Sequence, residues 1–198
     1  TPIQERSLSL LFEGRDLIGQ ARTGSGKTLA FALPMVEKID PKLRALQAIV
    51  LVPTRELAQQ VGEVVDAVGK GLGIRTALVF GGRSPAGQIA ALKAGAQIVV
   101  GAPGRVLDLM RQGFLKPERV SYFVLDEADE MLDQGFAPDV ERILGFMPRN
   151  RQTVLFSATI PAWVEQTASK HLRNPALVEI DTRPEDVPKI DHLSLIHI

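Results

Sequence analysis

Short apolar runs rich in valine and isoleucine alternate along the chain with stretches whose apolar residues recur at helical spacing. We expect strands where these runs lie, at residues 16–19, 48–52, 76–80, 97–100, 122–125, 153–156 and 177–180. Helical spacing predicts helices over residues 56–68 and 161–172. Strands that alternate with helices in this way are typical of a parallel sheet built from β-α-β units.

The run AIVLV at residues 48–52 is apolar at every position and does not alternate with polar residues. A strand of a parallel sheet has this pattern because helices cover both faces of the sheet. The sequence therefore predicts an α/β fold, a three-layer α/β/α sandwich around a mainly parallel sheet.

The charges of the chain balance, with 23 lysines and arginines against 23 aspartates and glutamates. No bulk positive field attracts nucleic acid, so any such contact must be local. The chain has no cysteine, which excludes disulfides, thiolate zinc sites and cysteine nucleophiles and favours a reducing, cytoplasmic setting. The apolar runs are far shorter than the roughly 18 residues of a membrane span, so we expect no membrane partner.

A length of 198 residues suits a single globular domain. We place this domain at residues 1–181, because the last predicted strand ends at residue 180. Residues 182–198 begin polar, with Pro184 and Pro188, and end apolar. This segment is either the start of a linker to another domain or a tail whose origin the sequence leaves open.

A glycine-rich segment, ARTGSGKT at residues 21–28, stands between the first predicted strand and an apolar stretch at residues 29–33. Glycines let backbone N–H groups converge on phosphate oxygens at the start of a helix. Lys27 adds a positive charge for the β- and γ-phosphates and Thr28 a hydroxyl for Mg²⁺, as in the pattern GxxxxGK(S/T), whose first glycine is Ala21 here. A plain glycine-rich turn is the alternative, but the flanking strand and helix favour a phosphate-binding loop.

Two acids, Asp126 and Glu127, directly follow the apolar run at residues 122–125. Ligands of open α/β sheets bind beyond the carboxyl ends of the strands. Phosphoryl transfer to water needs a carboxylate near Mg²⁺ and a second group for the attacking water, and these two acids can divide the roles. Such a pair alone is more often a solvated helix start. The phosphate-binding loop upstream favours the catalytic interpretation.

The string DEAD at residues 126–129 is the signature of the DEAD-box RNA helicases, and nearly the whole chain resembles the first half of that family. The family's other first-domain motifs occur in order, as TPIQ (1–4), ARTGSGKT (21–28), PTRELA (53–58), GG (81–82), PGR (103–105) and SAT (157–159). The resemblance implies a RecA-like ATP-binding domain of an ATP-dependent RNA helicase, which hydrolyses ATP to ADP and phosphate.

For the nucleotide, the resemblance implies that Gln4 reads the adenine edge of ATP through its amide. The residues expected to surround the triphosphate are Thr23, Gly24, Ser25, Gly26, Lys27 and Thr28. Asp126 would hold Mg²⁺ largely through water, with Thr28 as its companion, and Glu127 would position the hydrolytic water. A network of Asp129, Ser157 and Thr159 would link this acidic strand end to the RNA-bound state.

For RNA, the resemblance implies contacts to phosphates and 2′-hydroxyls. The residues expected to make them are Pro53, Thr54, Arg55, Gly82, Gly104 and Arg105. They follow three predicted strands and so belong to the ligand-bearing edge of the sheet. Backbone amides and single arginines read phosphate, and only 5% aromatic residues leave few platforms for base stacking. We therefore expect sequence-independent binding of RNA through its backbone.

Two features of the sequence limit the expected activity. Ala102 stands where the family usually has a threonine, which removes a phosphate-binding hydroxyl and should weaken RNA binding modestly. No second run of β-α units follows residue 180, so the family's second RecA-like domain, with its arginine finger, is not in this chain. An arginine finger is worth about 10³ to 10⁵ in rate, so we expect feeble turnover and no unwinding from this chain alone. That second domain is the expected protein partner.

Two other readings stay open at the level of sequence. The first is another P-loop ATPase of the same sheet class, such as a DNA motor, which the PTRELA, PGR and SAT strings oppose. The second is a scaffold that keeps the fold without activity. Such a scaffold would be marked by a lost catalytic residue, and Lys27, Thr28, Asp126 and Glu127 are all present.

Overall fold

The structure, a computed structural model, describes residues 1–180. The strands of this part are β1 (Leu17–Gln20), β2 (Ala48–Leu51), β3 (Thr76–Val79), β4 (Ile98–Gly101), β5 (Tyr122–Leu125), β6 (Gln152–Ser157) and β7 (Ala176–Glu179). The helices are α1 (Pro2–Phe12), α2 (Lys27–Lys38), α3 (Arg55–Gly69), η1 (a 3-10 turn, Lys70–Leu72), α4 (Ala86–Lys93), α5 (Pro103–Arg111), α6 (Ala128–Asp133), α7 (Ala137–Phe146) and α8 (Ala162–His171). The predicted domain end at residue 181 and the segment 182–198 lie outside the described residues.

The seven strands form one sheet in the order β3-β4-β2-β5-β6-β1-β7, and every pairing between neighbours is parallel. Each strand expected from the sequence is present, with both ends within one residue of the expected position. Strands β2, β4 and β5 are buried at every residue, as a sheet covered on both faces requires. The predicted three-layer α/β/α fold is therefore confirmed.

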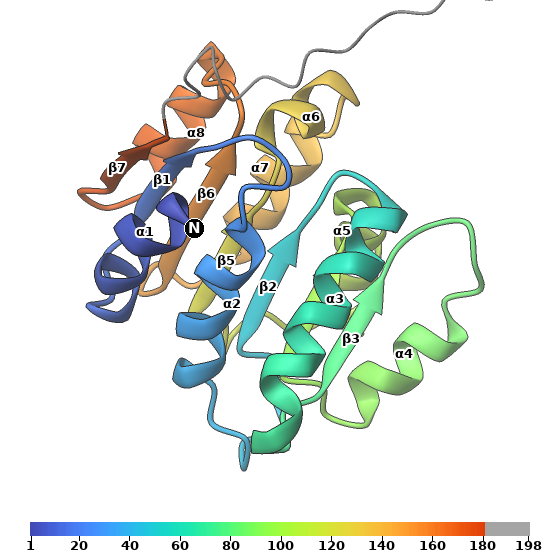
Figure 1. Cartoon of the computed structure of the whole chain (residues 1–198). Helices are drawn as coiled ribbons and strands as arrows, with labels where there is room; N and C mark the ends of the chain where they lie inside the picture. Colours follow the sequence, from blue (N-terminus) through green and yellow to red (C-terminus); the bar gives the residue numbers. More distant parts are fainter. Residues whose placement is uncertain (181–198) are drawn as a thin grey trace, which may run out of the picture.

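Two layers of helices enclose the sheet (Figure 1). Helices α1, α2 and α3 pack on one face, and α5, α6, α7 and α8 on the other, with α4 beside the edge strand β3. Because all strands run the same way, their carboxyl ends share one edge of the sheet and their amino ends the opposite edge. The loops at these two edges hold the polar groups considered below.

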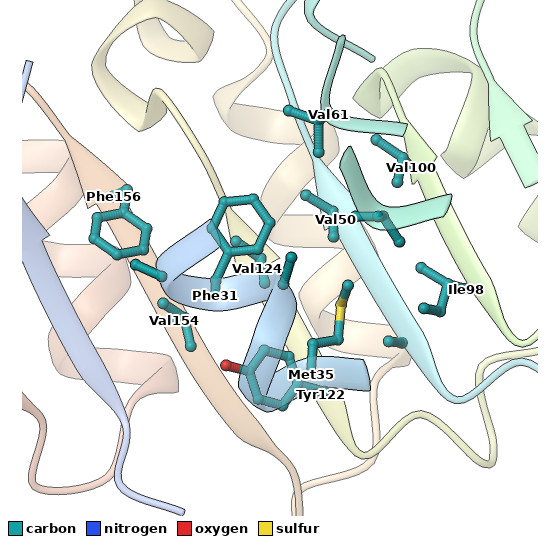
Figure 2. Close-up of a cluster of buried hydrophobic side chains, with 14 of the residues drawn as sticks. Phe31, Met35, Val50, Val61, Ile98, Val100, Tyr122, Val124, Val154 and Phe156 are labelled. Carbon is teal, nitrogen blue, oxygen red and sulfur yellow. The ribbon is translucent and has the colours of Figure 1, made fainter. Parts of the chain in front are cut away.

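The core between α2 and the sheet is built around aromatic side chains (Figure 2). Phe31 of α2 packs against Phe156 of β6, with ring centroids 6.1 Å apart, and both are fully buried. Burial of each ring stabilises the fold by roughly 1.5–3 kcal/mol. Gly19 of β1 leaves room for the second ring, since a Cβ there would lie 2.2 Å from Cε1 of Phe156. This packing fixes the helix that follows the phosphate-binding loop.

Polar side chains tie the amino ends of β1 and β6 together. The carboxylate of Asp16 accepts hydrogen bonds from the backbone N–H of Thr153 at 2.8 Å and of Arg173 at 2.6 Å. The side-chain amide of Gln152 donates to the carbonyls of Leu11 at 3.0 Å and Arg15 at 2.6 Å. The edge opposite the phosphate-binding loop is thus held by buried hydrogen bonds.

The helices expected at residues 56–68 and 161–172 are α3 and α8, which differ from those ranges by one residue at each end. Helices α1, α4, α5, α6 and α7 were not predicted. Helix α4 has no buried residue and α6 has only six residues, so neither shows a long apolar stripe. Helix α5 starts in the PGR string, which reads locally as a turn. None of the helices in the described part is long and apolar enough to cross a membrane.

Candidate functional site

Three neighbouring strands, β5, β6 and β1, place the predicted nucleotide-binding residues side by side. The phosphate-binding loop leaves β1 after Gln20, Asp126 follows β5, and Ser157 ends β6. The side-chain amide of Gln20 donates to the carbonyl of Ala158 at 3.2 Å, which joins the first and last of these loops. Residues more than a hundred positions apart in sequence therefore meet at the carboxyl edge of the sheet.

The phosphate-binding loop has the backbone that its glycines allow. Gly24 and Gly26 have φ values of +81° and +94°, in the left-handed region that side chains avoid. Gln4 of α1 lies against the loop and donates its amide N–H to the carbonyl of Gly26 at 3.0 Å. A Cβ at Gly26 would lie 2.7 Å from that amide nitrogen. Helix α2 begins at the next residue, with its first N–H groups facing the loop.

Lys27 is buried at the centre of the site, 5% exposed, as the first residue of α2. Its ammonium lies 3.5 Å from Oδ1 of Asp126 and 3.7 Å from Oε1 of Glu127, without a hydrogen bond to either. Oδ1 of Asp126 and the hydroxyl of Ser25 are likewise buried without a partner among the described residues. Buried polar atoms normally have partners, so the ammonium of Lys27 and the hydroxyl of Ser25 suit the oxygens of a ligand, and Oδ1 of Asp126 suits a cation.

Asp126 is held in an environment that disfavours its charge. Burial raises the pKa of its carboxyl to about 6, the charge of Glu127 adds to the rise, and the ammonium of Lys27 opposes it. Only 2% of the residue is exposed. A cation brought close to this carboxylate would stabilise the ionised form.

Glu127 has a strained backbone for a residue with a side chain, at φ 57° and ψ 54°. Such conformations persist only where the surrounding structure fixes them, and they occur often at functional sites. The hydroxyl of Thr23 donates to Oε1 of Glu127 at 2.7 Å. The strained turn and this hydrogen bond aim the carboxylate at the phosphate-binding loop.

The third polar group of the site joins α6 to the end of β6. The backbone N–H of Asp129 donates to the hydroxyl of Ser157 at 3.0 Å. In return, Oδ2 of Asp129 accepts hydrogen bonds from the backbone N–H and the hydroxyl of Thr159, at 2.8 and 2.9 Å. Burial raises the pKa of Asp129, but the hydrogen bonds from Thr159 and Ser157 outweigh it and leave the pKa below its ordinary value. This carboxylate is thus a charged acceptor that fixes the segment after β6.

A hollow of about 500 Å³ opens between these groups and α6. Sequence reasoning missed three of its lining residues, Glu130, Asp133 and Gln134. They stand at positions i, i+3 and i+4, so a helix expected from residue 128 through Gln134 would have placed them on one face. Burial and the neighbouring Glu127 raise the pKa of Glu130. The hollow is strongly acidic, with Lys27 as the cation in its lining.

The residues expected to bind RNA gather after three other strands of the same edge, β2, β4 and β3. The guanidinium of Arg55 lies over the ring of Phe80, 5.3 Å from its centroid, which brings the loop after β2 to the loop after β3. Arg105 donates to the carbonyl of Arg83 at 3.2 Å and so joins the loops after β4 and β3. No side-chain hydrogen bond or ion pair of the described residues links this group to the nucleotide group.

Several of these residues also have local structural roles. Thr54 caps α3, its hydroxyl accepting from the N–H of Leu57 at 3.2 Å, while Pro53 stands just before it. Pro103 and Gly104 form the first turn of α5, and Ala102 is its N-cap without a side-chain hydrogen bond. A threonine at position 102 would supply that missing acceptor. Pro53 and Pro103 are buried, whereas Thr54 and Gly104 stay partly accessible at the edge.

Among the described residues, the candidate site has no preformed cage for a metal ion. In this part of the chain, no three His, Cys, Asp or Glu side chains lie close enough together to hold one. Thr28 is the second residue of α2 and Asp126 follows β5, so a hydroxyl and one carboxylate reach the loop. Mg²⁺ is commonly held by one or two carboxylates, waters and substrate phosphates. The donor set therefore suits an ion that arrives with the nucleotide.

The parallel sheet, the glycine-rich loop between β1 and α2 and the acids after β5 define a P-loop nucleotide-binding protein of the RecA-like class. The sequence profile described as DEAD/DEAH box helicase matches residues 1–167. The chain belongs to this family.

Its relatives among characterised proteins are considerably longer. The DEAD-box ATP-dependent RNA helicase CshA of Geobacillus kaustophilus is 45% identical over 98% of this chain and 42% of its own length. The RNA helicase CrhR of Synechocystis sp. is 46% identical over the full chain and 40% of its own length. A DEAD box protein from the hyperthermophile Methanococcus jannaschii superposes with a TM-score of 0.87 at 41% identity, over 90% of this chain and 49% of its own. The chain thus spans less than half the length of each of these three proteins.

Proposed function

We propose that this chain is the ATP-binding domain of an ATP-dependent RNA helicase, which couples ATP hydrolysis to RNA unwinding or to remodelling of RNA–protein complexes. One observation supports this most directly. The groups suited to a triphosphate lie after β5, β6 and β1, and those suited to an RNA backbone lie after β2, β4 and β3, at one edge of one sheet. The names of the relatives, ATP-dependent RNA helicase and RNA helicase, agree with this assignment.

In the proposed hydrolysis, Glu127 orients the attacking water and receives its proton. The hydrogen bond from Thr23 and the fixed turn at Glu127 hold this carboxylate at the loop. Lys27 faces the β- and γ-phosphates, and the backbone N–H groups of residues 23–28 surround the triphosphate. Gln4, anchored on Gly26, is placed beside the loop, where its amide would meet the adenine edge.

The acidic hollow supports a requirement for Mg²⁺. Glu127, Asp129, Glu130 and Asp133 line it beside the single cation Lys27, so a bare triphosphate would be repelled. Mg²⁺ would supply the charge that neutralises the phosphates and stabilises the leaving group. Asp126 and Thr28 would hold it, the former largely through water.

The RNA contacts would be made by Pro53, Thr54, Arg55, Gly82, Gly104 and Arg105. Gly82 has a φ of +76°, and a Cβ there meets no atom within 4 Å, so its backbone is open to an approaching phosphate. Asp129, Ser157 and Thr159 would couple this contact to hydrolysis. A second RecA-like domain of the parent protein would complete the ATP site and supply the arginine finger. Cytoplasmic location remains a prediction from the cysteine-free composition.

The decisive experiment measures ATP hydrolysis by the full-length parent protein with and without single-stranded RNA, and compares Glu127→Gln with the parent sequence. We expect Glu127→Gln to lower kcat by at least about 100-fold while nucleotide binding persists, because it removes the acceptor of the water's proton. Glu63→Gln in α3 is the matched control, since it makes the same chemical change at an exposed position outside the hollow. It should keep kcat within about threefold.

Two results would contradict the proposal. Equal hydrolysis by Glu127→Gln and the parent protein would exclude the assigned role of Glu127. Stimulation by single-stranded DNA equal to that by RNA would favour the alternative of a DNA-directed P-loop motor.

A further inference from the structure

A second polar hollow lies at the opposite edge of the sheet, where β6 begins, which is the lower edge in Figure 1. Its volume is about 470 Å³, and the end of α7, the loop before β6 and the end of α8 form its walls. Five basic side chains line it: Arg149, Arg151, Lys170, His171 and Arg173. No acidic residue is among the lining residues, and we call this hollow the arginine pocket.

The neighbouring acids neutralise only part of this charge. Glu141 binds Lys170 at 2.6 Å and His171 at 3.1 Å. Asp16 lowers the potential at Arg151, but its carboxylate is occupied by two backbone N–H groups. Three arginines and one lysine against these two acids leave two positive charges before any protonation of His171. A chain of zero formal net charge therefore concentrates positive potential at one concave site.

Two of the three arginines are held in position and keep N–H groups to spare. Arg151 donates from Nε to the hydroxyl of Thr153 at 3.1 Å and from Nη1 to the carbonyl of Pro148 at 2.7 Å. Arg173 donates from Nη2 to the carbonyl of Arg151 at 2.7 Å. Arg149 has no hydrogen-bond or ion-pair partner within residues 1–180. Two fixed guanidinium groups with free donors, beside a third whose donors are all free in that range, are well suited to bind an anion.

The electrostatics of Arg151 agree with this geometry. Burial lowers the pKa of its guanidinium, Asp16 opposes the change, and the like charge of Arg173 acts with burial. Only 6% of Arg151 is exposed, so water screens this repulsion poorly. A bound anion would relieve it.

The shape of the arginine pocket limits what the anion is. Guanidinium forks match the oxygens of phosphate groups in pairs. A volume of about 470 Å³ suits a small molecule, whereas single-stranded RNA binds along open grooves with aromatic platforms. No phenylalanine, tyrosine or tryptophan lines the pocket. We propose that the arginine pocket binds a small anion with two or more phosphate groups.

The test measures binding of inorganic tripolyphosphate by isothermal titration calorimetry to the 198-residue chain with Lys27→Ala, which disables the phosphate-binding loop. We expect Arg149→Gln with Arg173→Gln to weaken this binding at least about tenfold, because each loses charged hydrogen bonds to phosphate. The matched control, Arg111→Gln with Arg142→Gln, removes two exposed arginines of α5 and α7 outside the pocket. It should change the affinity by less than about twofold.

The single variant Arg149→Gln tests whether weaker binding could come from misfolding. Its exposed side chain has no partner to lose within residues 1–180, so the unfolding temperature should stay unchanged while binding of tripolyphosphate still weakens. Equal weakening by the pocket and control variants would overturn the proposal, because general attraction would then account for binding. The competing ligand to test is an RNA strand of about eight nucleotides. If it displaces tripolyphosphate, and if its own binding is lost in the Arg149→Gln, Arg173→Gln variant, the assignment to a small ligand is overturned.

Discussion

At the scale of single residues, the burial of Asp126 suits a binding site but lowers the stability of the fold. It is almost fully buried, and its Oδ1 has no hydrogen-bond partner in the described chain. The ionised form is disfavoured until a cation or further donors arrive. Strain at Glu127 adds to this cost. Such groups are typical of sites selected for binding and catalysis in preference to stability.

This burial predicts how the stability of the chain depends on pH. The pKa of Asp126 is about 6 in the folded state against an ordinary 3.8, so its contribution is fully present below pH 3.8 and is lost as pH rises through 6. The loss is at most about 3 kcal/mol. In Asp126→Asn this group no longer titrates. Between pH 5 and pH 8 the free energy of unfolding of the variant should therefore fall less than that of the parent chain. Urea unfolding of both chains without nucleotide measures it, and parallel pH profiles would contradict the folded-state pKa.

At the scale of elements, the strands that carry the candidate RNA loops depend on close backbone contact. Gly101 ends β4, and a Cβ there would lie 2.2 Å from the carbonyl oxygen of Val79 on β3 and 3.0 Å from Cγ2 of Val106. The first of these atoms belongs to the backbone and cannot rotate away. Helix α5, which begins after Ala102 and carries Gly104 and Arg105, therefore follows the sheet at a point where only glycine fits.

We accordingly expect Gly101→Ala to destabilise the fold by about 1–3 kcal/mol, because β3 and β4 must move apart. The matched control is Gly145→Ala in α7, whose Cβ would meet nothing within 4 Å at an ordinary helical φ. That variant should be neutral or more stable by up to about 1 kcal/mol, since alanine favours helix. Urea unfolding decides between them, and equal stability of the two variants would show that the sheet adapts to the added methyl.

At the scale of the whole molecule, the carboxyl edge of the sheet carries two separate groups of candidate binding residues. Its amino edge carries a concentration of positive charge. The candidate nucleotide group lies after β5, β6 and β1, and the candidate RNA group lies after β2, β4 and β3. The arginine pocket lies beyond the other end of β6. Strand β6 thus has Ser157 of the nucleotide group at one end and Arg151 of the pocket just before the other.

The end of the domain at residue 181 is still a prediction, and truncation tests it. Every strand and helix of the described part ends before that residue. A chain that stops at residue 181 should therefore have an unfolding temperature within about 2 °C of that of the 198-residue chain. Such a shift corresponds to less than about 1 kcal/mol in the free energy of unfolding. Differential scanning calorimetry measures this. A drop of more than about 5 °C would place part of the domain beyond residue 181.

Much of the fold followed from local patterns in the sequence. The strands were predictable within one residue because parallel strands buried on both faces are continuous apolar runs, as at residues 48–52. The glycine-rich loop and the acids after β5 were recognisable because their chemistry is confined to neighbouring residues. Helices α4 and α6 were not, since a helix without a long buried stripe gives no periodic signal.

The sequence by itself determined the strands, helices α3 and α8, and which side chains suit a triphosphate. Only the tertiary structure decided how they meet, because the contacts join distant positions: Thr23 with Glu127 across 104 residues, and Asp129 with Thr159 across 30. It alone made the acidic face of α6 part of the nucleotide hollow. It also gathered Arg149 and Arg173, which no motif connects, into one pocket. Strand order sets these distances, and strand order depends on packing across the whole sheet.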